Sequence, residues 1–193
     1  MLSAIIATDE SERTLVPTLA ALVPGAISGL VAEVVVADGG SRDATAEVAD
    51  MAGCRFMASS EPLGARLKSA AASTRTPWLM FLRAGCVPEP AWVTAADRFM
   101  QTTDLLDDGA DRAAVFRPPS VADLLRPGLA EILALLRVTF GGGPKPEQGL
   151  LIARRFYDML GGHPAGGNAE AAMLRRLGRR RIAMLPTGAR PAG

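Results

Sequence analysis

The sequence predicts an α/β fold in which a mostly parallel central sheet is flanked by helices. Short apolar runs bounded by turn residues alternate with stretches in which apolar residues recur at helical spacing. Leu2 to Ala7 and Val34 to Val36 are two such runs, and each is followed by a polar turn and a helical stretch. The length, 193 residues, suits one core. We therefore expect a single α/β domain over residues 1–193.

The expected elements follow one another in strand–helix order. Strands are predicted at residues 2–7, 34–38, 54–58, 77–82, 113–116 and 182–185. The first helix is predicted from about residue 11 to Pro24-Gly25, and a later one begins at Pro88. The other helices are predicted at residues 45–52, 65–73, 121–138 and around 170–177. Pro24 and Gly25 are expected to end the first helix. Residues 141–146 are expected to form a mobile glycine-rich loop, and residues 187–193 a frayed tail.

Composition narrows the class of protein. Apolar residues make up 49% of the chain and charged residues 21%, which is typical of a globular protein. The net charge of +1 gives no general attraction to nucleic acid, so no nucleic-acid partner is expected. Cys54 and Cys86 are too few for a disulfide framework, which favours a cytoplasmic setting. No basic leader is evident at the N-terminus, and no apolar run approaches the roughly 20 residues that span a bilayer.

Asp38 ends a predicted strand and is followed by the pair Gly39-Gly40, which permits a tight turn. Ser41 and Asp43 can both cap the next helix. In open α/β sheets, ligands bind at the carboxyl ends of the strands. A carboxylate there can accept a hydrogen bond from a ribose hydroxyl or a base N–H. The alternative is an ordinary strand–turn–helix connection in which Asp38 is a turn residue.

Residues 38–45, Asp-Gly-Gly-Ser-Arg-Asp-Ala-Thr, resemble the Asp-Gly-Gly-Ser-Thr-Asp-Gly-Thr signature of family 2 glycosyltransferases. The members of that family have the GT-A fold and use nucleotide sugars, and the resemblance covers nearly the whole chain. It implies one GT-A-like domain with a nucleotide-binding half, residues 1–86, and an acceptor-side half, residues 87–193. It also implies that Asp38 and Gly39 lie at the nucleotide.

The resemblance indicates two further donor contacts. The family's Pro-x-x-Asn-Glu loop after the first strand is matched loosely by Ala7-Thr8-Asp9-Glu10, which implies that Asp9 contacts the nucleotide; helix capping is the alternative. The segment that begins at Gly64 resembles the family's Gly-x-Ala-x-x-x-Asn-x-Gly-Ala and places Arg66 near a diphosphate, which cations suit. Lys68 is at least as well explained as a solvated surface charge.

The predicted strand 77–82 ends at Arg83-Ala84-Gly85-Cys86, where the resemblance fails. The family ends this strand on Asp-x-Asp, or on a relative that keeps the last Asp, and these carboxylates hold a divalent cation against the donor diphosphate. Magnesium and manganese need hard oxygen ligands, which Arg83 and Gly85 do not supply. We therefore predict no metal ligands here, although the family uses magnesium or manganese. Arg83 either stabilises a departing diphosphate directly, or is a loop residue of an inactive site.

The acceptor side is indicated by the second half of the chain. Residues 147–155 resemble the family's Asp-Gln-Gly-x-x-x-Arg-Arg segment, which implies an acceptor-side place for Gln148. His163, the only histidine, can pair with a phosphate or ligate a metal, although a lone loop histidine is usually neither. Glu170 falls where the family has a Glu-Asp pair that includes the catalytic base. One carboxylate suffices for a base, and the alternative is a helix-start glutamate favoured by the dipole.

Five arginines, residues 175, 176 and 179–181, end the last predicted helix. They complement the helix dipole, or they contact anionic lipid headgroups, because many family members act on lipid-linked acceptors. The function that the resemblance implies is transfer of a sugar from a nucleotide-sugar donor to an acceptor hydroxyl, by a cytoplasmic protein that is peripheral at the membrane if its acceptor is lipid-linked. The alternative is a catalytically inactive relative that binds a nucleotide or a partner protein.

Overall fold

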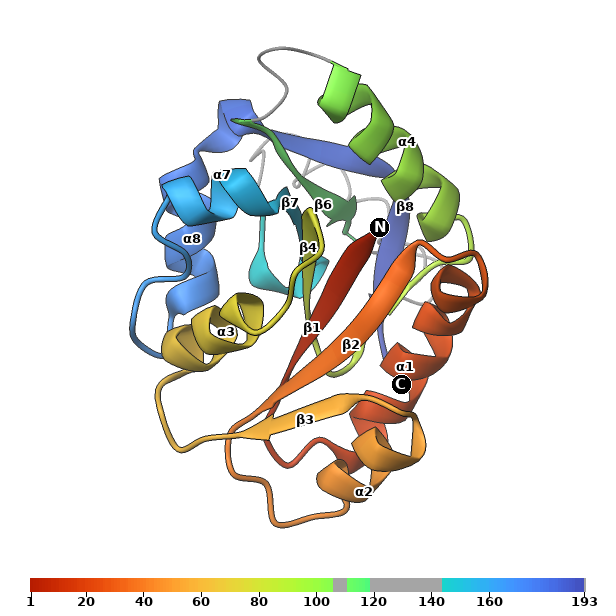
Figure 1. Cartoon of the computed structure of the whole chain (residues 1–193), viewed down its shortest axis with the longest axis vertical. Helices are drawn as coiled ribbons and strands as arrows, with labels where there is room; N and C mark the ends of the chain where they lie inside the picture. The colour runs from red at the N-terminus through yellow and green to blue at the C-terminus, as the bar shows by residue number, and fades with distance from the viewer. Residues whose placement is uncertain (106–110, 119–143, 193) are drawn as a thin grey trace, which may run out of the picture.

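An eight-stranded sheet with helices on both faces forms the centre of the molecule (Figure 1). The computed structural model describes residues 1–105, 111–118 and 144–192. The strands are β1 (Leu2–Thr8), β2 (Val31–Asp38), β3 (Arg55–Ala58), β4 (Trp78–Arg83), β5 (Cys86–Pro88), β6 (Ala113–Arg117), β7 (Leu150–Ala153) and β8 (Ile182–Pro191). The helices are α1 (Glu12–Ile27), α2 (Thr45–Met51), α3 (Leu63–Ala72), α4 (Trp92–Leu105), α7 (Arg154–Met159) and α8 (Ala169–Leu177), with single 3-10 turns η2 (Pro146–Gln148) and η3 (Arg179–Arg181).

The sheet has the order β3-β2-β1-β4-β7-β6-β8-β5. The first four strands in this order are parallel, whereas β7 is antiparallel to both of its neighbours and β5 is antiparallel to β8. In the parallel half, Thr8 is in register with Asp38 and Ala7 with Arg83. The carboxyl ends of β1, β2 and β4 therefore meet at one edge of the sheet. The α/β class with a mostly parallel, helix-flanked sheet is confirmed.

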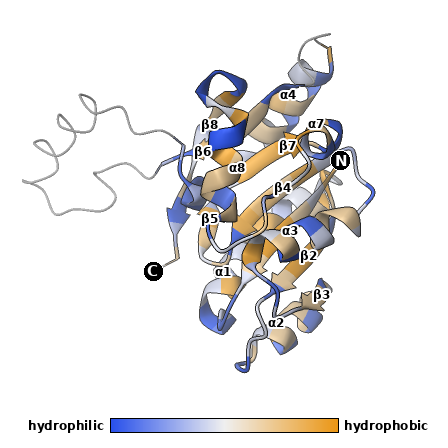
Figure 2. Cartoon of the chain, turned by 90° about the vertical axis from the view of Figure 1, so that its left-hand side faces the viewer, coloured by the Kyte–Doolittle hydropathy of each residue, from blue (hydrophilic) through white to orange (hydrophobic). Residues whose placement is uncertain are grey.

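Helices cover both faces of the sheet: α3, α7 and α8 lie on the left in Figure 1, and α1 and α4 lie on the right. Because both faces are covered, the central strands are mostly apolar, as expected for parallel sheets. Every residue of β1 is buried, and the central strands are predominantly hydrophobic (Figure 2). The apolar runs from which the strands were predicted are thus the core of the protein.

The prediction that Pro24 and Gly25 end the first helix is wrong, because α1 continues to Ile27. The backbone N–H of Ser28 donates to the carbonyl of Pro24, so the helical turn is completed beyond the proline. Gly25 has a different role. A Cβ at this position would lie 2.6 Å from the ring of Trp92, so a glycine is required for α1 and α4 to pack closely.

The prediction of a frayed tail at residues 187–193 is also wrong, since β8 runs to Pro191 and pairs with β5. The carboxylate of Glu89 accepts a 2.9 Å hydrogen bond from the N–H of Gly188, about a hundred residues further along the chain. Pro88 lies in β5, and the helix predicted from Pro88 onward begins at Trp92. These pairings join distant segments, which explains why β5 and the second half of β8 were not predicted.

The remaining predicted elements lie within three residues of their observed bounds, and β7 was not predicted. The helix predicted at 121–138 lies outside the described residues, as does the 141–143 part of the predicted glycine-rich loop. Within the described parts of the chain, no helix is long and apolar enough to cross a membrane.

Candidate functional site at the carboxyl edge of the sheet

Asp38 is fully buried at the end of β2. One carboxylate oxygen accepts hydrogen bonds from the hydroxyls of Thr8 (2.8 Å) and Ser41 (2.6 Å), and the other accepts from the backbone N–H groups of Gly40 and Ser41 (2.7 Å each). Burial raises the pKa of Asp38, but the hydrogen bonds from Ser41, Thr8 and Gly40 outweigh burial and leave the pKa below its ordinary value. The charged carboxylate thus holds the turn at residues 38–41 in place.

The loops after β1 and β2 are joined to each other. Ser41 does not cap the following helix; its hydroxyl oxygen accepts a 2.8 Å hydrogen bond from the N–H of Glu10. The Asp43 carboxylate accepts hydrogen bonds from the N–H groups of Glu12 (3.0 Å) and Thr45 (3.1 Å). It therefore binds the first residue of α1 and the first residue of α2. These contacts fix both loops at the edge where the strands end.

Three of the predicted nucleotide contacts lie together at this edge. Nη1 of Arg66, on α3, donates hydrogen bonds to two backbone carbonyls, those of Thr8 (3.0 Å) and Ala37 (2.9 Å). A Cβ on Gly39 would lie 3.2 Å from that Nη1 atom and 3.3 Å from Cγ of Asp9. Asp9 is exposed and Arg66 is partly exposed. The loop after β1, the loop after β2 and helix α3 therefore form one polar surface. Gly39 lies at the centre of this surface, and because it has no side chain the centre stays open.

Arg83 and Glu170 form an ion pair across the site. Nε of Arg83, at the end of β4, donates a 2.7 Å hydrogen bond to Oε2 of Glu170 near the start of α8, and Nη2 of Arg83 contacts the same oxygen. The hydrogen bond and charge of Glu170, with a smaller contribution from the charge of Glu147, raise the pKa of Arg83 above its ordinary value despite burial. Two residues predicted separately for the donor and the acceptor side are thus in direct contact.

The segment in the place of Asp-x-Asp does not fit a divalent cation. Its first position carries the guanidinium of Arg83, a positive group. Its third, Gly85, has a φ of +90°, and its N–H donates to the carbonyl of Thr14 (3.0 Å) and the hydroxyl of Thr18 (2.9 Å). Among residues 1–105, 111–118 and 144–192, no group of three or more His, Cys, Asp or Glu side chains could hold a metal ion.

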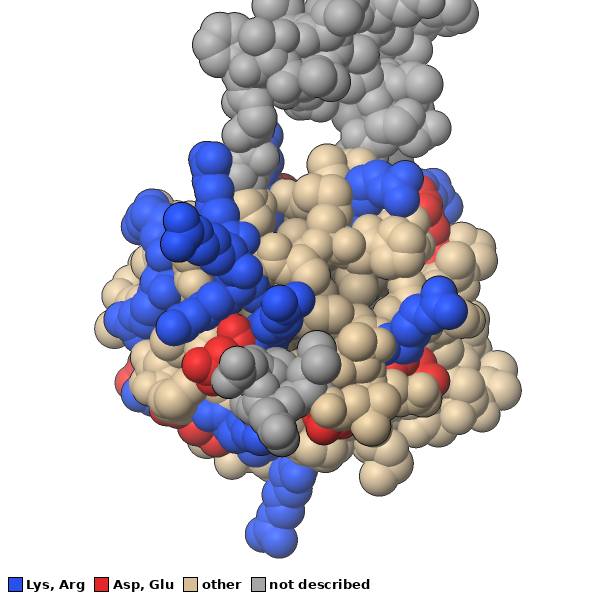
Figure 3. Space-filling model, turned by 90° about the horizontal axis from the view of Figure 1, so that it is seen from above, with Lys and Arg blue, Asp and Glu red and all other residues tan. Residues whose placement is uncertain are grey.

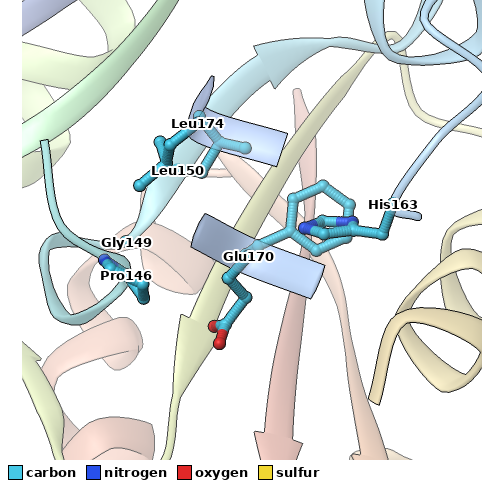
Figure 4. A pocket seen from close by; sticks show the side chains of 7 residues that line it. Pro146, Gly149, Leu150, His163, Glu170 and Leu174 are labelled. Carbon is cyan, nitrogen blue, oxygen red and sulfur yellow. The ribbon is translucent and has the colours of Figure 1, made fainter. Parts of the chain in front are cut away.

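A small pocket lies beside Glu170 and is lined by Phe81, Pro146, Gly149, Leu150, His163, Glu170 and Leu174 (Figure 4). The carboxylate of Glu170 extends away from the apolar side chains of Leu150 and Leu174, and His163 lies to the other side of Glu170 (Figure 4). The pocket is therefore mostly apolar, with one acid and one imidazole as its polar groups. The space inside is about the size of one water molecule, so it can take one group of a ligand and not a whole molecule.

His163 is buried and its ring is oriented by Tyr157. The Tyr157 hydroxyl oxygen accepts a 3.1 Å hydrogen bond from the N–H of His163 and lies 3.0 Å from Nδ1 of the same residue. The tautomer of the ring sets the direction of the second contact: with the ring proton on Nε2, the hydroxyl donates to Nδ1. Burial lowers the pKa of His163 to about 4, so the ring is neutral at pH 7.

The loop before α8 is held against α3. The N–H of Gly64 donates to the carbonyl of Gly166 (3.2 Å), and a Cβ on Gly64 would lie 1.8 Å from the carbonyl oxygen of Pro164. Only a glycine permits this approach. The helix that carries Arg66 and the loop that leads to Glu170 are consequently fixed relative to each other.

The amide of Gln148 is buried in the turn beside the pocket. Its oxygen accepts from the N–H of Lys145 (2.7 Å), and its nitrogen donates to the carbonyl of Phe116 (2.6 Å). Gln148 thus shapes the turn that brings Pro146 and Gly149 to the pocket. Tyr157, Phe81 and Thr8 were not predicted as site residues, because their contacts come from distant elements.

The arrangement defines a class of protein: an α/β sheet whose parallel strands present polar side chains at their carboxyl ends, opposite a helix that supplies a carboxylate. The model of glycosyl transferase family 2 matches residues 3–117, more than half of the chain. The chain therefore belongs to glycosyl transferase family 2. No curated protein matches the sequence significantly.

Solved structures of similar fold include the glucosyl-3-phosphoglycerate synthase of Mycobacterium tuberculosis. Its complex with Mn²⁺, UDP and glucosyl-3-phosphoglycerate has a TM-score of 0.68 and 22% identity, and the match covers 100% of this chain and 72% of that one. Another structure of that synthase gives a TM-score of 0.69 at 23% identity with the same coverage. A structure of a mycobacterial protein gives 0.67 at 23% identity and covers 100% of this chain and 67% of that one. These similarities establish the GT-A-like fold predicted from the sequence.

Proposed function

We propose that this protein transfers a sugar from a nucleotide-sugar donor to an acceptor hydroxyl. The observation that carries the proposal is the contact between Arg83 and Glu170 at the carboxyl ends of the parallel strands. Glycosyl transfer from a nucleotide sugar needs positive charge where the diphosphate departs and a carboxylate that takes the acceptor proton. Both groups are present at one place, and Arg83 is in register with Ala7, near the end of the strand that leads to Asp9.

The donor nucleotide binds to the first half of the chain, residues 1–86, over Asp9, Gly39 and Arg66. Asp9 supplies an exposed acceptor for nucleoside N–H or hydroxyl groups, and Arg66 supplies a partly exposed guanidinium for phosphate. Asp38 acts on the nucleotide through the turn at residues 38–41, because its own oxygens are engaged by Thr8, Gly40 and Ser41.

Arg83 binds the donor diphosphate in the place where the family has metal-binding carboxylates. A guanidinium offers hydrogen bonds in a fork that matches two phosphate oxygens, and it stays charged at any working pH. Its position at the end of β4, one strand from the Asp9 loop, suits this role. The transfer then proceeds without a divalent cation.

The acceptor binds on the side of residues 87–193, at the pocket beside Glu170. Glu170 is the general base, and the Nε2–H group of His163 donates a hydrogen bond to an acceptor oxygen. Gln148 contributes by holding the turn that forms one wall. Since the fold neighbour from Mycobacterium tuberculosis is a glucosyl-3-phosphoglycerate synthase, small phosphorylated hydroxy acids are among the acceptors to test.

A lipid-linked acceptor is supported by a cluster of exposed arginines. Lysine and arginine side chains gather on one side of the face in Figure 3, the side on which α7, α8 and η3 lie. The exposed arginines of these elements are Arg155, Arg175, Arg176, Arg179, Arg180 and Arg181. Sedimentation with phosphatidylserine-containing vesicles tests this part: binding that is lost when Arg179 and Arg180 are changed to Gln supports it, and no binding at low salt contradicts it.

The experiment for the proposed function is a transfer assay with a panel of nucleotide sugars that includes UDP-glucose. Each donor is incubated with 3-phosphoglycerate or with a lipid-phosphate acceptor, and the released nucleoside diphosphate and the glycosylated product are measured together. Formation of both in equal amounts supports transfer. If nucleotides bind but no donor is consumed, the protein is instead a catalytically inactive, nucleotide-binding member of the family.

A further inference from the structure

The ion pair between Arg83 and Glu170 engages both groups that the proposed transfer requires. We propose that the donor diphosphate displaces Glu170 from Arg83, so that donor binding releases the general base for the acceptor. This inference rests on the proposed function and adds to it how the general base is released. In this exchange, Arg83 replaces one hydrogen-bond partner, the Glu170 carboxylate, by another, the diphosphate.

The geometry of the pair suits such an exchange. Both donor groups of Arg83 that face Glu170, Nε and Nη2, are directed at one carboxylate oxygen. The side chain of Arg83 is 43% exposed, whereas that of Glu170 is 10% exposed. A ligand at the strand ends can therefore reach the guanidinium while Glu170 still holds it from the side of α8.

The chemistry favours the diphosphate over the carboxylate. A diphosphate carries more negative charge than a carboxylate and offers several oxygens to the guanidinium fork. The charge of Glu147 also acts on Arg83, so two acids compete with an incoming anion for this one cation. When the hydrogen bonds of Arg83 pass to phosphate oxygens, the lone pairs of Oε2 of Glu170 become available to an acceptor hydroxyl at the pocket.

Before the donor binds, the pairing occupies one oxygen of the base. Oε2 of Glu170 already accepts from Nε of Arg83 and also contacts Nη2, so this oxygen is a poor partner for an acceptor hydroxyl. The predicted consequence is a coupling between Glu170 and diphosphate affinity, although Glu170 is not itself a ligand of the diphosphate.

A double-mutant cycle tests this coupling. Isothermal titration calorimetry with inorganic pyrophosphate and with UDP, in EDTA, compares the parent protein with Glu170→Gln, Arg83→Gln and the double variant. Glu170→Gln frees Arg83, so both ligands should bind about threefold to tenfold more tightly, as expected for loss of one competing ion pair. Arg83→Gln should weaken binding about tenfold or more. In the Arg83→Gln background, Glu170→Gln should change nothing.

The chain offers a matched control. Arg55 and Glu33 form another Arg–Glu pair, at 2.9 Å, near the start of β3 and away from the strand ends of the site. Glu33→Gln removes the same charge and breaks the same kind of contact, and it should leave the affinity for both ligands unchanged. Thermal unfolding of every variant shows whether each is folded at the temperature of the titration.

Three results would overturn the exchange. In the first, Glu170→Gln binds pyrophosphate no more tightly than the parent. In the second, the gain persists without Arg83, which would mean only that a nearby negative charge has been removed. In the third, pyrophosphate and UDP do not bind to any variant. If the cycle behaves as expected but no donor is ever consumed, the proposed transfer fails and the exchange of partners stands.

Discussion

The hydroxyl of Thr8, at the end of β1, donates a 2.8 Å hydrogen bond to the buried carboxylate of Asp38, at the end of the adjacent β2. This contact joins the two loops from which Asp9 and Gly39 project. It gives Asp38 a role in holding the site together, since the carboxylate also accepts hydrogen bonds from Gly40 and Ser41.

Asp38→Asn should lower the free energy of unfolding by about 1–3 kcal/mol, because an amide nitrogen cannot accept the hydrogen bonds that one carboxylate oxygen now accepts. The lowered pKa of Asp38 stabilises the fold above its unfolded pKa of about 3.9, and this stabilisation is lost as the pH falls through the lower folded pKa. Urea unfolding at pH 7 measures the effect. Asp9→Asn, at an exposed position, is the control and should keep the parent stability; an equally stable Asp38→Asn would contradict this account.

Gly39→Ala should weaken UDP binding without unfolding the protein. The added methyl group would lie 3.2 Å from Nη1 of Arg66 and 3.3 Å from Cγ of Asp9, so both side chains must shift slightly, and the methyl group would fill the centre of the proposed nucleotide surface. We expect a loss of about tenfold, which corresponds to about 1.4 kcal/mol. Gly167→Ala is a matched control, because a Cβ there meets nothing within 4 Å. Equal UDP affinity in the two variants, measured by calorimetry, would exclude a nucleotide at Gly39.

His163 should titrate with a pKa of about 4, well below the ordinary value of 6.5, because it is buried. As the only histidine, it gives one unambiguous set of ring signals in NMR. Because the unfolded chain binds the proton more readily, stability should fall as the pH drops from about 6.5 towards 4, by about 2 kcal/mol at pH 5. His163→Phe should lack this part of the pH dependence. A midpoint near 6.5 would show that the ring is solvated.

The parallel half of the sheet could be predicted from the sequence because its strands carry their own signals. The run Val34 to Val36 is bounded by turn residues, and Asp38 followed by two glycines marks where the strand ends. Local apolar patterning and turn chemistry were sufficient there. They were insufficient for β5 and the end of β8, whose pairing depends on segments about a hundred residues apart.

In the site, too, local features could be predicted and contacts between distant segments could not. The sequence indicated which residues carry charge at the strand ends, and Asp9, Gly39 and Arg66 do lie together. It did not indicate that Arg83 and Glu170, 87 residues apart, form an ion pair. Nor did it show that the oxygens of Asp38 are engaged within its own turn. The sequence around an aspartate at a strand end is the same whether its carboxylate faces a ligand or the backbone.

The rate of sugar transfer in EDTA, measured for the parent protein and for Glu170→Gln with the donor that the panel identifies, tests the proposed roles of Arg83 and Glu170 together. We expect the parent to be as active in EDTA as with added manganese, because Arg83 supplies the positive charge at the diphosphate. Glu170→Gln should lower turnover by about 10²–10⁴-fold, the usual contribution of a general base, while the donor still binds. Transfer that requires manganese, or that continues at the parent rate in Glu170→Gln, would contradict these roles.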